Sequence, residues 1–398
     1  MLCVGGGGGT NAERSDSAFP CGAWEREVFL VPKLCLGTHC FPCQNSLPII
    51  SMAGYNAAKV VLNAWGYCPV NALVTGGAGF LGLYVVEQLV ERGDRVRAVC
   101  RSESRRLAEL GVEVVRADLR DREAVAAACR GIEAVFHVAG VTGFRGSWKH
   151  FYENNTLATR HVVEGCLAGG VGRLVYTSSP SVTFNGCSQE GVDESAPYPR
   201  RWLCHYPHSK ALAEQHVLAS NGRGGLLTCA LRPHLIWGPR DRYLIPGLLE
   251  KARRGQLCRV GDGRNLIDMV YVENAAAAHL LAADALRPGS PAPGRTYFIT
   301  QGEPVNCWRW VDELLALAGL PPVRKSISAR AAWFSGLFHE IYYRLFRRHE
   351  EPPMNRFLAA QLSESHYFDI TRAREDIGYH PAISTAEGMR RLAAAGLR

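Results

Sequence analysis

The chain has 398 residues, of which 47% are hydrophobic and 21% charged, a composition typical of globular rather than disordered or fibrous proteins. The formal net charge of +8 is mildly basic, but the lysines and arginines are scattered, so nucleic-acid binding is not expected. The sequence contains neither an apolar run of membrane-spanning length nor a secretory signal pattern, and we therefore expect a cytoplasmic protein.

Residues 1–68 are predicted to form a poorly ordered N-terminal extension. They contain a glycine run and six of the 14 cysteines, but no sustained hydrophobic period. Cys35, Cys40 and Cys43 include a single CxxC pair without a second pair at zinc-binding spacing, so no metal site is expected. A true start further downstream, near Met52, is the alternative interpretation of this segment.

From Asn71 onward, segments with strand character alternate with segments of helical periodicity. This alternation predicts an α/β fold with a doubly wound parallel sheet. The expected strands are 71–76, 95–101, 112–119, 133–140, 172–179 and 226–233, and the expected helices are 81–93, 104–111, 122–131, 155–167 and one after Tyr206. Residues 69–238 are accordingly predicted to form the sheet domain.

Residues 239–398 are predicted to form mainly a smaller, mixed lobe that binds substrate, with some segments returning to the sheet domain. Glycine and proline are more frequent here, and the lobe is expected over the carboxyl ends of the strands, where open sheets bind ligands. The segment 331–353 is rich in aromatic residues and has two interpretations. It forms a wall of an apolar substrate pocket, or it rests on a membrane surface.

The motif TGGAGFLG places three glycines, Gly76, Gly79 and Gly82, between the first strand and the first helix. The first permits a tight turn, the second lets the backbone approach a pyrophosphate, and the third lets helix and strand pack closely. The helix N-terminus would offer N–H groups to the phosphates. The context of strand, turn and helix predicts a dinucleotide-binding Rossmann domain.

The end of the second strand selects between the two nicotinamide cofactors. Cys100 stands where a carboxylate would bind the ribose of NAD, and Arg101 and Ser102 follow it. A guanidinium and a hydroxyl suit the 2′-phosphate, so NADP(H) is favoured, with NAD(H) as the alternative and a solvated surface role for Arg101 also open. Asp118 would accept a hydrogen bond from the adenine or cap the following helix.

Tyr206 and Lys210 form the strongest chemical signal, because their spacing places them one turn apart on a helix. A neighbouring ammonium would lower the pKa of the phenol and make Tyr206 a general acid for ketone reduction. Ser179, at the carboxyl end of its strand, would bind the substrate carbonyl. Ser179 is preferred over Ser178, which would cap the strand exit.

Other polar residues near these motifs receive supporting roles. Asn155 would bridge backbone or water near Lys210 or serve a structural purpose. The remaining histidines lack metal-ligand spacing. His137, His205 and His208 are interpreted as residues that surround the site rather than as acid–base groups.

In order along the chain, TGGAGFLG, RADL, FHVAG, VYTSS, YPHSK, and LRP followed by WGP resemble the extended short-chain dehydrogenases/reductases. Within them, residues 71–398 resemble the 3β-hydroxysteroid dehydrogenase/isomerase branch, and more closely its bacterial 2-alkyl-3-oxoalkanoate reductases. The resemblance implies the Ser–Tyr–Lys roles, a backbone contact to the cofactor near Pro233, and a homodimer through the helices around Asn155 and Tyr206. Further cofactor contacts are expected at Phe80, Leu81, Leu119 and Ala139.

The resemblance also implies NADPH-dependent reduction of a 3-oxo group on a long-chain 2-alkyl fatty acid. Trp333, Phe334, Phe338 and Tyr342 would suit the alkyl chains. The alternatives are a steroid or sterol dehydrogenase of the same branch, a sugar-nucleotide epimerase, a dehydratase, and a non-enzymatic NADP(H) sensor. Ser179 is followed by Pro180 and Ser181 rather than by an acid, which disfavours the dehydratase.

Overall fold

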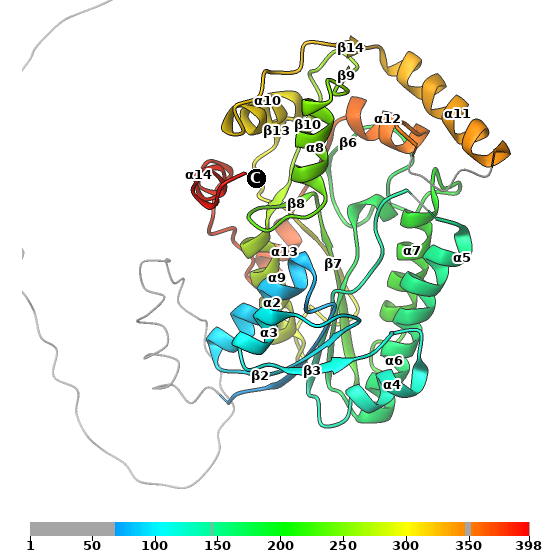
Figure 1. Ribbon diagram of the computed structural model, residues 1–398. Helices are drawn as coiled ribbons and strands as arrows, with labels where there is room; N and C mark the ends of the chain where they lie inside the picture. Colours follow the sequence, from blue (N-terminus) through cyan, green and yellow to red (C-terminus); the bar gives the residue numbers. More distant parts are fainter. Residues whose placement is uncertain (1–67, 145, 347–351, 398) are drawn as a thin grey trace, which may run out of the picture. The chain divides into compact units, whose positions relative to one another are not determined.

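The computed structural model describes residues 68–144, 146–346 and 352–397 (Figure 1). The predicted N-terminal extension, including its CxxC pair and Met52, lies outside the described residues apart from Cys68. In the part that is described, no helix is long and apolar enough to cross a membrane, and no group of three or more His, Cys, Asp or Glu side chains is placed to hold a metal ion.

A seven-stranded sheet in the order β12-β7-β5-β4-β1-β2-β3 forms the centre of the fold. Every neighbouring pair in it is parallel, which confirms the predicted doubly wound α/β class. Its strands are β1 (Asn71–Thr75), β2 (Arg95–Cys100), β3 (Glu113–Arg116), β4 (Ala134–His137), β5 (Arg173–Thr177), β7 (Leu227–Pro233) and β12 (Thr296–Ile299).

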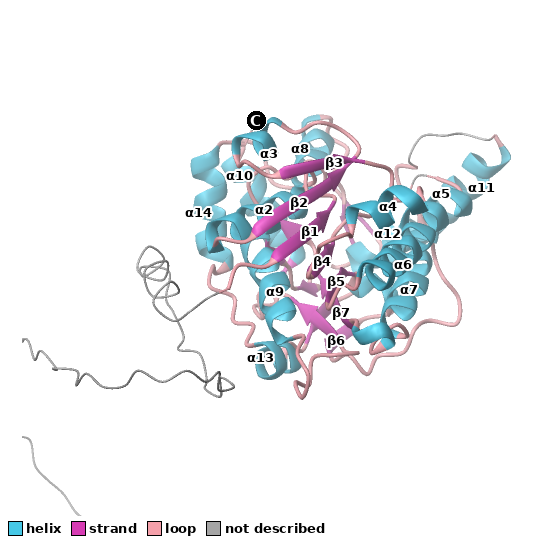
Figure 2. Cartoon of the chain, turned by 90° about the horizontal axis from the view of Figure 1, so that it is seen from below, coloured by secondary structure: helices cyan, strands magenta, loops and turns pink. Residues whose placement is uncertain are grey.

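Helices cover both faces of this sheet, as Figure 2 shows. Because both faces are buried, the strands are almost continuously hydrophobic, and side chains alternate between two cores. In β1, Ala72 and Val74 pack toward one layer, whereas Leu73 packs toward the other. The first layer holds α2 (Phe80–Arg92), α3 (Arg105–Glu109), α9 (Val272–Ala285) and α13 (Thr371–Ile377), and the second holds α4 (Arg122–Ala128), α6 (Ala158–Gly169) and α7 (His205–Leu218).

A helical stretch precedes α6 and begins earlier than the sequence predicted. It consists of α5 (Trp148–Phe151) and a π-helical segment, η2 (Tyr152–Leu157), which runs directly into α6. A π-helical turn places one extra residue in the helix and is frequent at functional sites. Asn155 lies within it.

A smaller mixed sheet, β13-β10-β15-β6, and two short strand pairs build the second lobe around a core rich in tryptophan. The chain passes between the lobes more than once, since β6 belongs to this sheet and β12 to the large one. The strands of the lobe are β6 (Gln189–Val192), β8 (Ile236–Trp237), β9 (Arg259–Val260), β10 (Leu266–Ile267), β11 (Val270–Tyr271), β13 (Val305–Asn306), β14 (Ser326–Ile327) and β15 (His366–Phe368). Its helices are α8 (Leu244–Arg253), α10 (Cys307–Leu317), α11 (Ala329–Leu345), α12 (Arg356–Ser363) and α14 (Thr385–Ala395), and two short 3₁₀ turns occur at Pro180–Val182 (η3) and Arg223–Gly225 (η4).

Candidate active site

The predicted site residues follow the carboxyl ends of six parallel strands, and these ends lie at one edge of the sheet. The topology reverses between β1 and β4, and an open sheet of this kind binds its ligand in the crevice at such a reversal. At this edge the structure gathers Gly76 after β1, Arg101 after β2, Asp118 after β3, Ala139 after β4, Ser179 after β5 and Pro233 at the end of β7.

The glycine turn between β1 and α2 leaves no room for side chains. A Cβ on Gly82 would lie 2.2 Å from the carbonyl oxygen of Gly76, and a Cβ on Gly79 would lie 3.0 Å from the same atom. Gly76 adopts φ +70°, which favours glycine. Gly79 caps α2 without a side-chain acceptor, and the first turn of α2 carries no acid. The backbone N–H groups and the positive helix end therefore fit the pyrophosphate of a dinucleotide.

The other predicted cofactor contacts surround this turn. Ala139 lies against Gly76, with its Cα 3.0 Å from where a Cβ of Gly76 would stand, and its N–H donates to Thr75 Oγ1 at 3.2 Å. Phe80 and Leu81 are the first two residues of α2. Pro233 ends β7 and pairs with β12, and Leu119 accepts a hydrogen bond from His161 through its carbonyl oxygen.

Arg101 and Ser102 are exposed in the bend that follows β2, whereas Cys100 is buried. Glu103 is the first acid after β2, and Arg101 and Ser102 stand before it. The carboxylate of Asp118 binds Arg120 through Nη2 at 2.7 Å, and this hydrogen bond, with the nearby charge of Arg101 as a smaller cause, lowers the pKa of Asp118 to about 2.

The alternative role of Asp118 as a helix cap is wrong. Asp121 caps α4 instead, because its carboxylate accepts from the N–H groups of Glu123 and Ala124 at 3.0 and 3.1 Å. Asp118 lies three residues too early to reach these donors. It lines a surface hollow of about 390 Å³ together with Arg120, Asp121, Glu153 and Leu157.

Ser179, Tyr206 and Lys210 come together at the carboxyl end of β5. The hydroxyl of Ser179 lies near the phenol of Tyr206, close enough to lower its pKa, and is 2.9 Å from Ser181 Oγ. Lys210, one turn after Tyr206 on α7, is buried and donates to the carbonyl oxygen of Thr177 at 2.6 Å. Ser178 Oγ is buried and has no hydrogen-bond partner among the described residues.

The predicted lowering of the pKa of Tyr206 by Lys210 is not what the structure shows. Burial raises the pKa of Tyr206, the nearby hydroxyl of Ser179 opposes this, and the neighbouring Cys204 adds to it. Burial also lowers the pKa of Lys210 to about 7, so its positive charge is only partial at neutral pH. The ammonium is held by the Thr177 carbonyl and by the ring of Tyr176, whose centroid is 4.3 Å from Nζ.

Asn155 holds the loop after β4 against α7. Its side-chain oxygen accepts from the Val141 N–H at 2.7 Å, and its amide nitrogen donates to the Val141 carbonyl and to Ser209 Oγ at 3.0 and 2.9 Å. A Cβ on Gly140 would lie 3.4 Å from Asn155 Oδ1 and 3.6 Å from Lys210 Nζ. Asn155 therefore bridges backbone close to Lys210, one of the two roles anticipated for it.

The three histidines near the motifs contact neighbouring protein side chains. His137 is buried between the hydroxyls of Thr75 and Thr159, at 2.7 and 2.8 Å, and burial lowers its pKa to about 3. The ring of His208 stacks between Trp148 and Trp202, with centroids 4.5 and 5.1 Å away. The exposed His205 meets the edge of Trp148.

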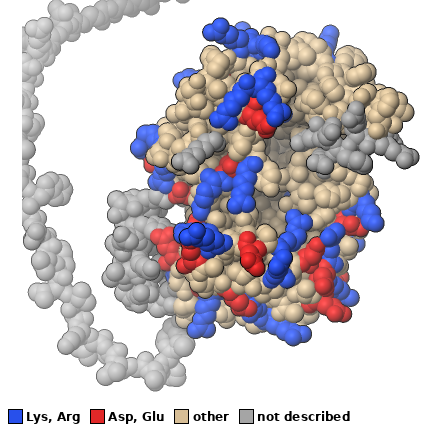
Figure 3. Space-filling view, in the orientation of Figure 1, with Lys and Arg blue, Asp and Glu red and all other residues tan. Residues whose placement is uncertain are grey.

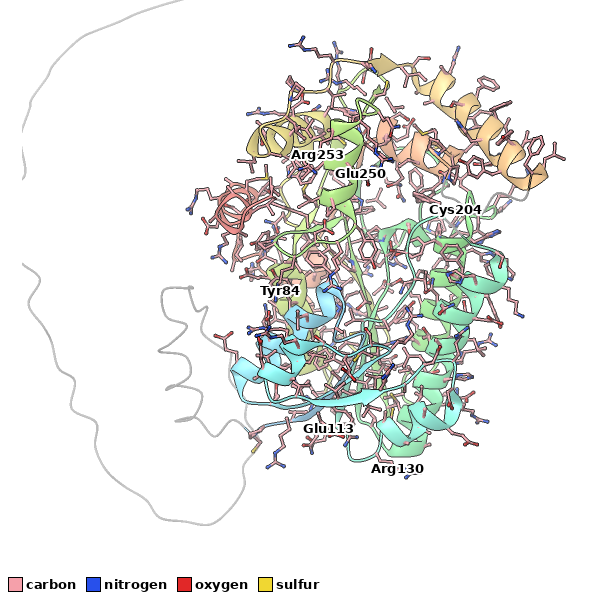
Figure 4. The ribbon with its side chains drawn as sticks, viewed as in Figure 1. Tyr84, Glu113, Arg130, Cys204, Glu250 and Arg253 are labelled. Atoms are coloured by element: carbon pink, nitrogen blue, oxygen red, sulfur yellow. The ribbon has the colours of Figure 1, made fainter. Side chains whose placement is uncertain are left out.

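Sequence reasoning missed the groups that hold Lys210 and the apolar residues that adjoin the start of α7. Thr177 acts through its backbone and Tyr176 through its ring face, neither of which a sequence pattern reveals. Cys204 directly precedes α7 and is labelled below α12 and α11 in Figure 4. It belongs to an apolar cluster beside Tyr206, formed by Phe144, Phe184, Leu203, Cys204, Phe357 and Ala360.

The aromatic segment after Ala331 does not line this cluster as one interpretation predicted. In α11, Phe334 and Phe338 are 64% and 66% exposed, and Trp333 is 38% exposed. The helix turns small or polar residues toward α12 instead, because a Cβ on Gly336 would lie 2.5 Å from the backbone of Asn355. Of these two helices, α12 contributes an aromatic side chain to the cluster, Phe357, beside Phe144 and Phe184.

Comparisons with known proteins agree with this geometry. Residues 73–327 match the model of the 3-beta hydroxysteroid dehydrogenase/isomerase family. The chain is 46% identical over 325 residues to the 2-alkyl-3-oxoalkanoate reductase of Stenotrophomonas maltophilia, covering 81% of this chain and 98% of that protein. It is 43% identical to the reductase of the same name from Shewanella oneidensis, over 81% of this chain and 86% of that one.

Solved structures share the fold over the same part of the chain. MoeE5 in complex with UDP-glucose and NAD superposes with a TM-score of 0.62 at 28% identity, covering 82% of this chain and 98% of that one. The crystal structure of gox2253 gives a TM-score of 0.66 at 26% identity, over 81% and 97%. The chain therefore belongs to the 3-beta hydroxysteroid dehydrogenase/isomerase family of extended short-chain dehydrogenases/reductases and is an NAD(P)-dependent oxidoreductase.

Proposed function

We propose that this oxidoreductase reduces the 3-oxo group of a 2-alkyl-3-oxoalkanoate to the 3-hydroxy acid, with NADPH as the hydride donor. The observation that carries the proposal is the meeting of the Ser179 and Tyr206 hydroxyl groups at the carboxyl end of β5, next to the apolar cluster that includes Cys204. Identity of 46% and 43% to two reductases with this substrate in their names supports the substrate class.

The chemistry divides between cofactor and protein. NADPH, when bound, supplies a hydride to the carbonyl carbon. Ser179 and Tyr206 donate hydrogen bonds to the carbonyl oxygen and stabilise the negative charge that develops on it. The phenolic proton of Tyr206 then passes to that oxygen, so that the C=O group becomes C–H and O–H. A phenol with a raised pKa is fully protonated before the reaction, which is the state that an acid in the reductive direction requires.

Lys210 stands behind this pair as a buried cation. With a pKa of about 7 it is partly charged at neutral pH, and its ammonium favours the phenolate that remains after proton transfer. Its hydrogen bond to Thr177 and the support of Asn155 for the adjacent loop fix the end of its side chain. Ordering these groups before substrate arrives removes reorganisation from the reaction step.

The preference for NADPH rests on Arg101 and Ser102. Both are exposed at the end of β2, where the 2′-phosphate would lie. Arg101→Ala is expected to lower kcat/KM for NADPH by about tenfold or more while leaving NADH little affected. Arg105→Ala, which removes an exposed arginine of α3 paired with Glu109, is the matched control. Equal loss with both cofactors would contradict the assignment.

The apolar cluster beside Tyr206 is the part of the site that fits alkyl chains. Phe184 follows the Ser179 turn and packs on Phe357, with ring centroids 5.6 Å apart, and Phe144 packs on the other side of Phe357 at 5.5 Å. Each buried methylene contributes about 0.8 kcal/mol to binding. Reduction of short-chain analogues is therefore expected to be much less efficient than reduction of long-chain substrates.

The decisive experiment follows NADPH and NADH oxidation with a long-chain 2-alkyl-3-oxo acid, a 3-keto steroid and a sugar nucleotide. Tyr206→Phe, run in parallel, should reduce turnover by about 10²- to 10⁴-fold. Turnover of the acid that this variant abolishes would support the proposal. Preferred turnover of the steroid or the sugar nucleotide would replace the substrate, and no turnover of any ketone with intact NADPH binding would favour a sensor.

A further inference from the structure

Three titratable side chains meet where the end of the large sheet adjoins the small lobe, and the proposed mechanism does not use them. His234 follows the last residue of β7, Asp268 lies between β10 and β11, and His366 is the first residue of β15. They are 6%, 0% and 2% exposed. Because burial of ionisable groups is costly, a buried cluster of them beside a ligand-binding edge is a candidate for a functional site.

The hydrogen bonds of Asp268 show which nitrogen of His234 is free. Asp268 Oδ1 lies 2.9 Å from His234 Nδ1, and its Oδ2 accepts from the Phe368 N–H at 2.9 Å. A carboxylate only accepts, so Nδ1 carries the hydrogen and faces Asp268. Among the described residues the ring has no other hydrogen bond, and Asp268 has no Lys or Arg partner. His234 is therefore the cation available to Asp268, and its Nε2 is left for a ligand.

The neighbouring ring of His366 is neutral. Its Nε2 donates to the Gln361 carbonyl oxygen at 2.8 Å. Burial, with the charge of His234 as a smaller cause, lowers the pKa of His366 to about 3. The two ring centroids lie 4.9 Å apart, so when one of these imidazoles is charged it is His234. The Nδ1 of His366 is buried without a hydrogen-bond partner among the described residues, so the protein's own groups do not complete this cluster.

Contacts between α7 and β7 show that the two elements run in opposite directions. Near the start of β7, Thr228 Oγ1 donates to the Val217 carbonyl oxygen at 2.9 Å. Closer to its carboxyl end, Arg232 donates to the Glu214 carboxylate at 2.6 and 3.0 Å. Two residues along a strand advance about 6.6 Å, and one turn of a helix advances about 5.4 Å. The residue two positions after Arg232 is therefore level with the residue one turn before Glu214, which is Lys210.

His234 is the residue two positions after Arg232, and it points to the same side of the strand. Side chains alternate along a strand, and the ladder between β7 and β12 continues through His234, whose N–H donates to the end of β12 at 3.1 Å. The guanidinium carbon of Arg232 lies 5.3 Å from the ring centroid of Phe298. That ring stacks on Phe368, whose centroid is 5.2 Å from the His234 ring. His234 thus stands on the α7 side of the sheet, at the level of Lys210.

We propose that His234 binds the carboxylate of the substrate through the Nε2–H of its protonated ring, while Asp268 holds that ring in place. The inference rests on the proposed function, because a 3-oxo acid carries its carboxylate one carbon away from the reacting carbonyl carbon. A group that binds this carboxylate must stand beside Tyr206, and Lys210, level with His234, is one turn from that tyrosine on α7. The charged hydrogen bond is stronger than a neutral one and orients the acid.

The surroundings suit an acid that carries alkyl chains. The ring of Phe184, which belongs to the apolar cluster, stands edge-on to His366 with centroids 6.5 Å apart, so the cluster adjoins the histidines. Figure 3 shows the visible face hollowed between the small lobe and the sheet domain, with Lys and Arg side chains near the hollow. Positive side chains there attract an anionic substrate. The carboxylate would lie at His234, and the chains would extend along the cluster.

The test compares a long-chain 2-alkyl-3-oxo acid with its methyl ester as substrates of the wild type and of His234→Asn. The asparagine amide stands near the place of Nδ1 and can still donate to Asp268, whereas Nε2 and the charge are lost. KM for the acid should rise by about 10- to 100-fold, and KM for the ester should stay within about threefold. A cluster that only ties the small lobe to the sheet would raise both alike, and that result would overturn the proposal.

Further variants sharpen this comparison. Asp268→Asn removes the charge that stabilises the imidazolium and should raise KM for the acid by about tenfold, with little effect on the ester. His380→Asn changes an exposed histidine before α14 and is the matched control, which should behave as the wild type. Where thermal melting shows that His234→Asn does not fold, His234→Gln replaces it. This variant keeps a donor near the place of Nε2 and loses the charge, so KM for the acid alone should rise by about tenfold.

A binding assay separates this inference from the proposed substrate. Titration calorimetry of the cofactor-loaded protein with a long-chain 2-alkyl-3-hydroxy acid and with its methyl ester needs no turnover. The wild type should bind the acid about tenfold or more tightly than the ester, and His234→Asn should abolish the difference. That result without turnover of the oxo acid would reject the proposed substrate and keep the carboxylate site. Equal binding of acid and ester by the wild type would overturn the site, even with rapid reduction of the oxo acid.

Discussion

The edge of the large sheet that carries the candidate site differs from the helix α11 in how its side chains are packed. At the edge they are contacted from several directions, whereas on α11 only one face is contacted. At the edge, Lys210 is enclosed by α7, the Thr177 carbonyl and the ring of Tyr176, and Asn155 ties the next loop to the same helix. On α11, the inner face is held by α12 and the outer face is exposed. The residues proposed to transfer the proton are thus held by several elements, whereas the large apolar side chains on the outer face of α11 are exposed.

This difference follows from how much a misplaced side chain would cost in each of the two regions. A misplacement of about 1 Å at reacting groups costs roughly a hundredfold in rate, so these groups need contacts on every side. Binding of alkyl chains is non-directional and tolerates many arrangements. Three pairs of substitutions and one pH comparison would break or sharpen the contrast.

The largest expected effect separates two phenylalanines on neighbouring helices. Phe357→Ala empties a position in the cluster beside Tyr206 and should lower the free energy of unfolding by about 3–5 kcal/mol. Phe338→Ala, on the exposed outer face of α11, should change it by about 0.5 kcal/mol or less. Denaturant unfolding of both variants measures the difference. Similar losses would mean that Phe338 is covered in the folded protein.

The next comparison concerns two adjacent serines. Ser179→Ala removes the hydroxyl that lies near the Tyr206 phenol and should lower kcat by about a hundredfold or more. Ser178→Ala removes a buried hydroxyl that no described group satisfies, so activity and stability should stay near the wild type. Steady-state kinetics of the two variants decide the matter. A larger loss for Ser178→Ala would transfer the role to that residue.

Two glycines within helices provide the third comparison. Gly82→Ala drives a Cβ against the backbone of Gly76 and should destabilise the protein by about 1–3 kcal/mol, with weaker cofactor binding. Gly247→Ala in α8 meets no atom within 4 Å and should stabilise it by about 0.5–1 kcal/mol. Thermal melts with and without NADPH would show both signs. A stabilising Gly82→Ala would rule out the close approach of α2 and the turn.

The last comparison is a pH dependence, which is small over any one pH unit and accumulates over the window. The pKa of Lys210 is about 7 in the folded protein and 10.5 for a free lysine, so between these values the unfolded chain binds a proton that the folded chain does not. Stability relative to Lys210→Met should rise with pH across that window, by at most about 1.4 kcal/mol per pH unit. Unfolding free energies of both proteins from pH 7 to 10 provide the test. A flat difference would mean that Lys210 titrates normally.

Local sequence was sufficient wherever the relevant contacts are close along the chain. The glycine turn, the helix that follows it and the one-turn spacing of Tyr206 and Lys210 involve residues within a few positions of one another. The alternation of strands and helices likewise predicted the parallel sheet. The π-helical segment at Asn155 was not predicted, because its extra residue is held by Val141 and by Ser209, 54 positions away.

What the sequence alone determined was therefore the fold class and the chemical type of the site, since backbone sterics, hydrophobic period and short-range spacing are written in neighbouring residues. Tertiary structure decided the rest. The pKa values of Tyr206 and Lys210 are set by burial, which depends on distant elements, and not by their mutual spacing. The exposure of α11 was decided in the same way, because its amphipathic pattern fits either a pocket wall or a surface until the packing of α12 selects the face that is covered.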